Sequence, residues 1–460
     1  MSTLSEVNTA KIDVGVEPVQ PEKSSRLKAF ILIWFGQLVS AIGSGMTSFT
    51  LGVVIFQRTG SATKFALIFL FASLPAIIVL PLAGVLADRW DRVWAMILGN
   101  IGAGLAKLAI ALMFYLDILQ VWQVYLAVMA VSAFGFILGI SYTTLTTILV
   151  PRNQFGRVAG MTQTSQAAAQ ILPPLIGGAL LSAVKVEGII LIDIATYVFA
   201  ILTLLIVRIP REQAEQPVVP KSAESPAPRR GPIWREAFTG WHYIKERPGL
   251  LALLIYFAIV NLIIGCATVL FTPMILSFSN AKVLGTILSI SGVGFLCGSV
   301  VMSAWGGPKR RVLGVLGFGG LFGVFCAITG LRPSFAVIAA GTFGMFSLLP
   351  IINGCSQAIW QSKVPIAVQG RVFAVRRLIG ASTIPTAALI AGPLADRVFE
   401  PLMSSRFLQR TIGHLVGLGH GRGIAFMFVV SGLLVILTQF GGYFYPHIRH
   451  IEDELPDAPV

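Results

Sequence analysis

Apolar runs long enough to cross a lipid bilayer constrain the fold of this chain more than any other feature. An α-helix needs roughly 20 residues to cross about 30 Å of hydrocarbon. The 460 residues contain twelve such runs, at 29–56, 65–87, 93–116, 122–150, 158–184, 188–207, 250–278, 283–306, 312–331, 335–362, 377–395 and 424–446. Because only helices and closed barrels satisfy their backbone groups in lipid, the pattern predicts an all-α integral membrane protein with twelve transmembrane helices.

Composition indicates that lipid is the solvent along much of the chain. Apolar residues make up 55% of the sequence and charged residues only 12%. A water-soluble protein would lack the polar surface to cover itself, whereas helices that face lipid need none along their sides. The four cysteines lie in apolar runs without metal-ligand spacing, so we expect neither a metal site nor a cofactor.

The basic residues predict the orientation in the membrane. Lys and Arg number 34 against 20 Asp and Glu, an excess that could also suggest a nucleic-acid partner. Most of these basic residues fall in loops on one side of the predicted spans, the side that holds both termini. By the positive-inside rule we expect a chain in the inner membrane of the cell with both termini in the cytoplasm. Because this rule accounts for the basic excess, we expect no nucleic-acid partner.

A polar stretch divides the spans into six and six. Residues 210–232 are rich in Pro, Ala, Glu and Ser, which is typical of a flexible linker. The amphipathic pattern that follows, over 233–247, predicts a helix on the inner leaflet, with docking onto the bundle as the alternative. The expected organisation is a disordered cytoplasmic tail at 1–28, a six-helix bundle at 29–208, a cytoplasmic linker at 209–248, a second six-helix bundle at 249–447 and a tail at 448–460.

The two halves carry an internal repeat. Val-Pro and Gly-Arg-Val occur at 150–151 and 156–158, and again at 364–365 and 370–372, an offset of 214 residues. The same offset carries Gly84 onto Gly298 and Gly178 onto Gly392. Three matches at one offset, in equivalent places of the predicted spans, favour a duplicated unit of six helices. Two related halves of this kind are typical of secondary transporters.

The loop between the second and third runs places Gly84 four residues before Asp88, which is followed by Arg89 and Arg92. Gly84 would let helices approach closely, and Asp88 could pair with a cation or cap a facing helix. The loop resembles the signature of the major facilitator superfamily, which implies a gate that holds one state of an alternating-access cycle closed. The alternative is anchoring by the two arginines. The predicted gate residues are Gly84, Asp88, Arg89, Arg92, Gly156, Arg157, Gly370 and Arg371.

Pro174, Gly177 and Gly178 resemble the end of a motif that marks exporters in this superfamily, although Pro173 stands where a glycine is expected. Proline breaks the backbone ladder and glycine permits tight packing, so a bent, close-packed helix is expected in any case. The two Gly-Arg-Val loops resemble the corresponding loops in the branch of this superfamily that includes enterobactin exporters and macrolide efflux proteins. That resemblance implies export rather than uptake.

In this superfamily the first, fourth, seventh and tenth spans line the central cavity. The resemblance therefore implies a substrate cavity lined by Gln37, Ser44, Tyr142, Thr143, Asn261, Asn353, Gln357 and Trp360. None of these residues is charged, which favours a bulky amphipathic ligand over a small anion. The alternative for about half of them is hydrogen bonding between helices.

Two charges lie well inside predicted spans, Lys107 in the third and Asp193 in the sixth. Intramembrane charges are candidates for function, and a proton-driven carrier needs a carboxylate that titrates during its cycle. These two residues are therefore the candidates for coupling. The alternatives are that Lys107 snorkels or serves packing.

The sequence thus predicts a secondary active transporter that exports a small amphipathic molecule, such as a drug, a siderophore or another natural product, by proton-driven alternating access. Its expected partners are the lipid bilayer, the substrate and protons, and the participation of other efflux components stays open. A facilitator or importer is the alternative. A membrane enzyme is a remote one, because His414 and His420 lack a convincing partner. We therefore expect no catalytic residue.

Overall fold

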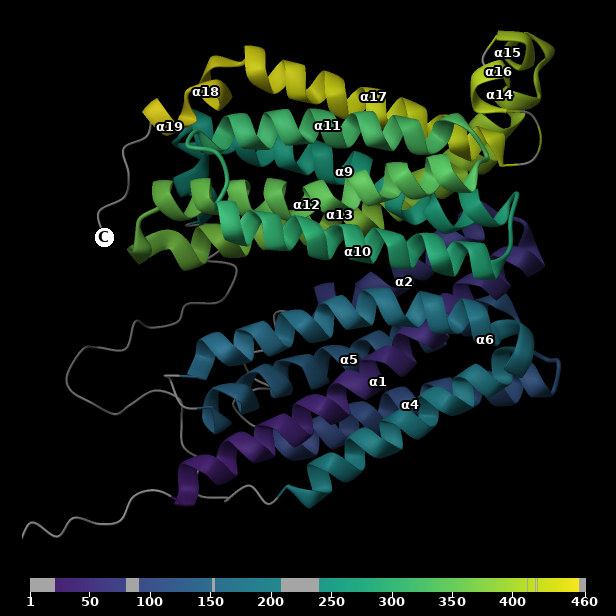
Figure 1. Cartoon of the computed structure of the whole chain (residues 1–460), viewed down its shortest axis with the longest axis vertical. Coiled ribbons are helices and arrows are strands. Elements are labelled where there is room, and N and C mark those ends of the chain that lie inside the picture. Colours follow the sequence, from purple (N-terminus) through teal and green to yellow (C-terminus); the bar gives the residue numbers. More distant parts are fainter. Residues whose placement is uncertain are drawn as a thin grey trace, which may run out of the picture.

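The computed structural model describes residues 21–79, 91–150, 154–207, 240–411, 413–417, 419 and 421–454, and these contain helices but no strand (Figure 1). The long helices are α1 (Pro21–Thr59), α2 (Ala62–Val79), α4 (Arg92–Tyr115), α5 (Val121–Leu149), α6 (Phe155–Ile206), α9 (Pro248–Leu276), α10 (Ala281–Trp305), α11 (Arg311–Leu331), α12 (Phe335–Lys363), α13 (Ile366–Leu394) and α17 (Arg422–Phe444). Short elements are the π-helix η3 (Ala395–Phe399) and the helices α14 (Glu400–Ser404), α15 (Arg406–Thr411), α16 (Gly413–Val416), α18 (Pro446–Arg449) and α19 (Ile451–Glu454). The all-helical prediction is confirmed.

Ten of the described helices are long and apolar enough to cross a membrane, which supports a multi-pass membrane protein. One of them, α6, has 52 residues and turns at Lys185, whose φ of 56° and ψ of −173° are not helical. Its two parts match the predicted spans 158–184 and 188–207. The shorter α2 has 18 residues. We interpret α2 and both parts of α6 as spans, which would give the twelve that the sequence predicts.

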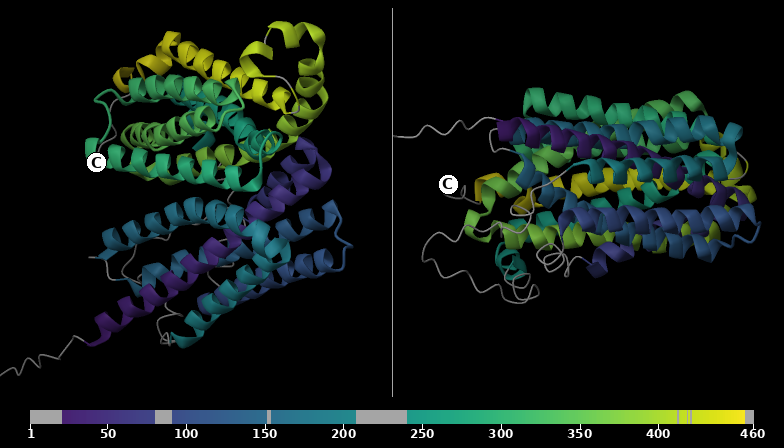
Figure 2. Two further views of the ribbon diagram at one scale, coloured as in Figure 1. Left: turned by 45° about the vertical axis from the view of Figure 1, so that its right-hand side comes forward. Right: turned by 90° about the horizontal axis from the view of Figure 1, so that it is seen from below.

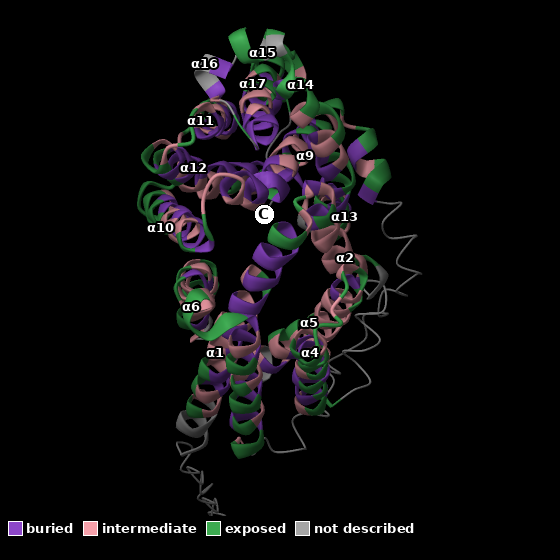
Figure 3. Cartoon of the chain, turned by 90° about the vertical axis from the view of Figure 1, so that its right-hand side faces the viewer, coloured by how far each residue is buried: buried purple, intermediate pink, exposed green. Residues whose placement is uncertain are grey.

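The helices form two bundles that meet along two seams. Helices α1, α4, α5 and α6 pack together at the bottom of Figure 1, and α9, α10, α11, α12 and α17 pack together at the top. Helix α10 packs against α6 in one seam, and α13 packs against α2 in the other. Large apolar side chains such as those of Leu105, Leu205 and Leu437 are exposed, as expected where helices face lipid. Figure 3 shows that exposed residues run along the outer sides of the helices.

The seams lie toward one end of the molecule. We call the end where α1 begins and α19 ends the terminus face, and the other end the opposite face. Gly178 packs on the Ala281 carbonyl, where α10 begins, and an ideal Cβ on Gly178 would lie 2.8 Å from that oxygen. An ideal Cβ on Gly392, near the end of α13, would lie 2.6 Å from Thr63 Cα at the start of α2. The bundles therefore converge at the opposite face, and they diverge toward the terminus face (Figure 2).

The apolar core of the first bundle is divided. One buried cluster, toward the terminus face, includes Phe30, Met96 and Leu145, and another, toward the opposite face, includes Leu51 and Ile190. A polar network described below lies between them. The second bundle instead has one large continuous core.

Residues 209–239 of the predicted linker lie outside the described residues, as do 1–20 of the predicted N-terminal tail and 455–460 of the predicted C-terminal tail. The part of the amphipathic segment that is described packs on the second bundle. Ile244 is completely buried in the core of that bundle, and Gly240 contacts the backbone of Arg371. These are the contacts expected from the docking alternative.

Candidate functional site

The predicted gate loop is described only at its end. Gly84, Asp88 and Arg89 lie outside the described residues. Asp91 caps α4, because its Oδ1 accepts hydrogen bonds from the backbone N–H groups of Val93 at 2.9 Å and Trp94 at 3.0 Å. Arg92 begins the helix and is 9% exposed. The gate role of this loop stays a prediction.

The two Gly-Arg-Val loops lie at the terminus face, at the starts of α6 and α13. Gly156 belongs to α6 and Arg157 is exposed. A Cβ on Gly370 would meet no described atom within 4 Å, and Arg371 is half-buried. In this conformation Gly370 therefore packs against no described neighbour, and the gate role of these residues also stays a prediction.

The exporter-like motif forms part of a seam between the bundles. The Pro174 carbonyl lies directly against Gly285 of α10, and Gly178 lies against Ala281 of the same helix. Gly177 packs on α1, where an ideal Cβ would lie 3.2 Å from the Phe49 ring. The motif therefore provides a smooth surface on which α6 approaches both α10 and α1.

The predicted cavity residues of the first half come together. Gln37, Ser44, Tyr142 and Thr143 line a pocket of about 510 Å³ inside the first bundle, which we call the first-bundle pocket. Within the described structure, Gln37 Nε2 is a buried donor without a hydrogen-bond partner, and Asn100 Oδ1 is a buried acceptor without one. Buried polar atoms of both kinds therefore belong to residues that line the pocket.

The predicted cavity residues of the second half line a separate pocket, with one exception. Asn261, Asn353 and Gln357 line a space of about 280 Å³ that we call the second-bundle pocket. Trp360 does not line it, because its side chain is completely buried. Its ring instead lies 5.4 Å from the Arg376 guanidinium carbon.

The prediction of a neutral cavity is wrong for this second pocket, because Arg376 and Arg377 also line it. The sequence predicted a span that begins at 377 and assigned the neighbouring basic residues to a loop. The helix instead begins at Ile366, so both arginines lie within α13. An apolar run marks where a helix faces lipid, and it misses the part that faces a polar interior. The run of Arg376 and Arg377 directly before apolar residues was the available signal.

A third pocket lies between the two bundles. It has a volume of about 440 Å³ and is lined by residues of both, including Phe65, Phe69, Phe271 and Phe346. We call it the interbundle pocket. Lys107 also lines it, so a cationic side chain reaches a mainly aromatic and apolar space that also holds Ser and Thr side chains.

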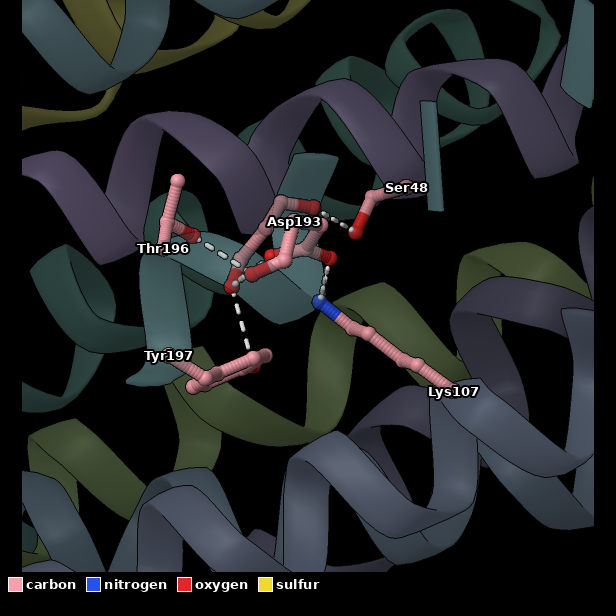
Figure 4. A network of polar contacts seen from close by, with 6 residues as sticks. Ser48, Lys107, Asp193, Thr196 and Tyr197 are labelled. Atoms are coloured by element: carbon pink, nitrogen blue, oxygen red, sulfur yellow. Dashed lines mark hydrogen bonds and ion pairs between the residues drawn. The ribbon is translucent and has the colours of Figure 1, made fainter. Parts of the chain in front are cut away.

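The two predicted coupling residues form a buried ion pair. Lys107 Nζ lies 2.5 Å from Asp193 Oδ2, although 86 residues separate them in the sequence (Figure 4). The side chains are 3% and 0% exposed, respectively. The alternative that Lys107 snorkels to the membrane surface is therefore wrong.

Hydroxyl groups extend this pair toward the first-bundle pocket. Ser44 Oγ lies 3.4 Å from Asp193 Oδ1 and 2.9 Å from Tyr197 Oη. Lys107 Nζ also lies 4.9 Å from the centre of the Tyr197 ring. Ser44 and Tyr197 both line the first-bundle pocket, whereas Lys107 lines the interbundle pocket. The ion pair is thus placed between two cavities, and hydroxyl groups connect it to one of them.

The ion pair is costly to change. Removing one partner of a buried pair leaves an uncompensated charge, which costs about 3–5 kcal/mol. Close packing leaves little room for rearrangement, since an ideal Cβ on Gly43 would lie 3.0 Å from Asp193 Oδ1. Neutralising either side chain would therefore leave the other charge buried without its counterion.

Comparison with known proteins shows which family this chain belongs to. A family model described as Major Facilitator Superfamily matches residues 33–388. Macrolide efflux protein A of Streptococcus pyogenes is 27% identical over 385 residues, which are 80% of this chain and 90% of that protein. Multidrug efflux pump Tap of Mycolicibacterium fortuitum is 24% identical over 386 residues, 80% of this chain and 89% of the pump.

A solved structure supports the fold independently. A bacterial homolog of the human lysosomal transporter Spinster, in an inward-facing and unoccupied conformation, superposes with a TM-score of 0.67 at 15% identity and covers 95% of this chain and 99% of its own. At that identity the likeness concerns the fold alone. The two helical bundles and the family match over most of the length point to the same fold. The chain belongs to the major facilitator superfamily of membrane transporters and is similar to its macrolide-efflux branch.

Proposed function

We propose that this transporter is an antiporter that exports small amphipathic molecules from the cytoplasm in exchange for protons. The direction is supported by relatives that are named efflux proteins and by the exporter-like motif at the seam. The basic loops on the side of the termini support a cytoplasmic terminus face. The aromatic interbundle pocket supports an amphipathic ligand with a large apolar part.

Alternating access is supported by the way in which the bundles meet. They contact each other at the opposite face and diverge at the terminus face, so this conformation would admit a substrate from the cytoplasm. Closing the terminus face and opening the other would require the seams to separate near Gly178 and Gly392. Smooth glycine surfaces suit such a movement, because helices can part there without pulling apart interlocked side chains.

Proton coupling rests on the single observation that carries the proposal, the Lys107–Asp193 pair between two pockets. A proton that enters through the first-bundle pocket would reach Asp193 by way of Tyr197 and Ser44. Lys107 would then face the interbundle pocket without its counterion, in an apolar environment that disfavours a lone charge. A cationic or polar substrate group in that pocket would in turn affect the pair. Substrate and proton would therefore act on the same two side chains.

The test is transport in inverted membrane vesicles that carry an imposed proton gradient. A panel of lipophilic dyes, macrolides and siderophores identifies a working substrate with the unchanged protein. We expect Asp193→Asn to abolish gradient-driven accumulation while downhill movement of the same compound continues. The matched control is Asp117→Asn. The Asp117 side chain is 91% exposed, and it lies on the connection between α4 and α5, away from the ion pair.

Unchanged gradient-driven accumulation in the Asp193→Asn protein would refute the coupling role. If the unchanged protein moves substrates only downhill, whether or not a proton gradient is present, the facilitator alternative is correct. Accumulation of no compound of the panel would refute export of this substrate class.

A further inference from the structure

The second-bundle pocket differs from the other two in its charge. Its lining includes the guanidinium groups of Arg376 and Arg377 and the amides of Asn261, Asn353 and Gln357. No Asp or Glu is among the residues that line it. The pocket is therefore rich in hydrogen-bond donors and carries positive charge without an acidic residue beside it.

Arg376 is held firmly within this pocket. Its Nη1 donates to Gln357 Oε1 and its Nη2 donates to Ser356 Oγ, both at 2.8 Å. Both acceptors belong to α12, and the Trp360 ring of the same helix lies beneath the guanidinium group. The side chain is thus fixed in one orientation before any ligand arrives, which lowers the entropic cost of binding.

The charge of Arg376 is not compensated within the described structure. A guanidinium group has five N–H donors, and the two hydrogen bonds above leave the others available. No described carboxylate lies within 4.0 Å of it. Arg376 is also the eleventh residue of α13, about 15 Å along the helix axis from Ile366. A charge at that depth is unfavourable unless a function or an anion compensates for it.

The surroundings define what kind of anion would fit. Leu254, Phe257 and Phe373 provide an apolar wall beside the donors. Asn261 and Asn353 are exposed and make no hydrogen bond to another described residue, so their amides remain available. An arginine fork matches the two oxygens of a carboxylate, a sulfonate or a phosphate.

We propose that the second-bundle pocket binds an anionic group, a carboxylate, sulfonate or phosphate, of the transported molecule. Arg376 is the principal contact and Arg377 adds positive charge at the exposed side. The proposal deepens the proposed function and rests on it, since the pocket is taken as one wall of the transport path. It makes the preferred substrate an amphipathic molecule that carries a negative group as well as a large apolar part.

The experiment compares two probes that differ only in that group. A rhodamine dye with a free carboxylate and the methyl ester of the same dye are titrated against the full-length protein in nanodiscs of phosphatidylcholine, and binding is followed by fluorescence polarisation. We expect the free acid to bind about tenfold more tightly than the ester, the size expected of one charge-assisted contact. Arg376→Gln should remove this preference.

Two variants separate recognition from folding. Arg376→Lys retains the charge and loses the fork, so part of the preference for the acid should remain. Arg332→Gln removes an exposed arginine at the end of α11 on the opposite face, and the full preference should remain. A variant that elutes as a folded monodisperse protein and still binds the ester shows that the loss concerns the anionic group.

A second arm identifies the source of the anion. Nanodiscs that contain phosphatidylglycerol present to the same pocket a lipid phosphate that carries a net negative charge, whereas choline neutralises the phosphate of phosphatidylcholine. If that lipid weakens binding of the acid in the unchanged protein but has no such effect in Arg376→Gln, the pocket accepts lipid phosphate, and the assignment to a transported molecule is overturned.

Equal binding of acid and ester, or a preference that persists in Arg376→Gln, also overturns the proposal. Proton-driven export of the ester alone would leave the proposed function intact. If the protein exports neither dye and no compound of the panel, both the proposed function and the anion site are contradicted.

Discussion

Asp396 forms a contact between the bundles that can be tested separately from substrate binding. It lies in η3, just after α13, and its carboxylate accepts three hydrogen bonds at the start of α2. Ser61 Oγ donates to Oδ2 at 2.7 Å, and the backbone N–H groups of Ala62 and Thr63 donate at 3.0 Å. An acidic side chain of the second bundle thus caps a helix of the first bundle at the opposite face.

The size of this contribution can be worked out from these contacts. Asn in place of Asp396 keeps one acceptor oxygen but loses the charge and one set of lone pairs. Hydrogen bonds to a charged group contribute about 1.5–3 kcal/mol and neutral ones about 0.5–1.5 kcal/mol. Allowing for the partial exposure of this site, we expect Asp396→Asn to weaken closure of the opposite face by about 2 kcal/mol, a change of roughly 30-fold in the ratio of the two states.

The assay is a distance measurement between the two bundles. Spin labels at Tyr115 and Arg332 lie at the ends of α4 and α11 on the opposite face, in a protein whose four native cysteines have been replaced. Pulsed electron paramagnetic resonance should show a new, longer distance in Asp396→Asn. Asp117→Asn is again the control, because Asp117 lies on the same face and its carboxylate lies 4.0 Å from Arg58 of its own bundle. A distance distribution in Asp396→Asn that matches the unchanged protein would refute the reasoning.

Two further predictions concern the seam and the ion pair. Gly392→Val should force α13 away from α2, because an ideal Cβ already lies 2.6 Å from Thr63 Cα; overpacking of about 1–3 kcal/mol should lengthen the same spin-label distance. Gly160→Val should leave that distance unchanged, because an ideal Cβ on Gly160 meets no described atom of another helix within 4 Å. Lys107→Met should lower the apparent melting temperature, because an unpaired buried Asp193 costs about 3–5 kcal/mol. The Lys107→Met, Asp193→Leu double variant should regain thermal stability but not gradient-driven transport; equal melting temperatures for all three proteins would contradict the ion-pair argument.

The helices could be predicted from the sequence because lipid imposes a length and an apolar composition on each of them. The start of α13 could not, since Arg371, Arg376 and Arg377 interrupt the apolar run although they lie within the helix. Apolar periodicity reports the face toward lipid, whereas this part of α13 faces a polar pocket.

Contacts between segments that are distant along the chain could not be predicted from the sequence either. Lys107 and Asp193 were both recognised as unusual charges, but nothing in their order along the chain shows that they pair. The contact of Asp396 was missed, although Gly-x-Leu-Ala-Asp-Arg occurs at 392–397 as it does in the predicted gate loop at 84–89. Its partners are mainly backbone N–H groups, which every residue except proline carries, so no residue type marks them in the sequence. The cavity residues could be named in advance because the family resemblance assigns four spans to the cavity. Their division between two pockets is a tertiary property.

The two glycine seams suggest how such a chain could arise. Gly178 and Gly392 occupy equivalent positions in the repeat, and each packs at the start of the second helix of the other half. A free-standing six-helix chain with one such glycine would form both contacts at once in a twofold-symmetric pair, with each copy supplying the glycine of one contact and the receiving helix of the other. Fusion of the two copies would release each contact from that symmetry. The carboxylate of Asp396 could then be gained at one contact alone, which lets the two sides of a once symmetrical assembly acquire different strengths.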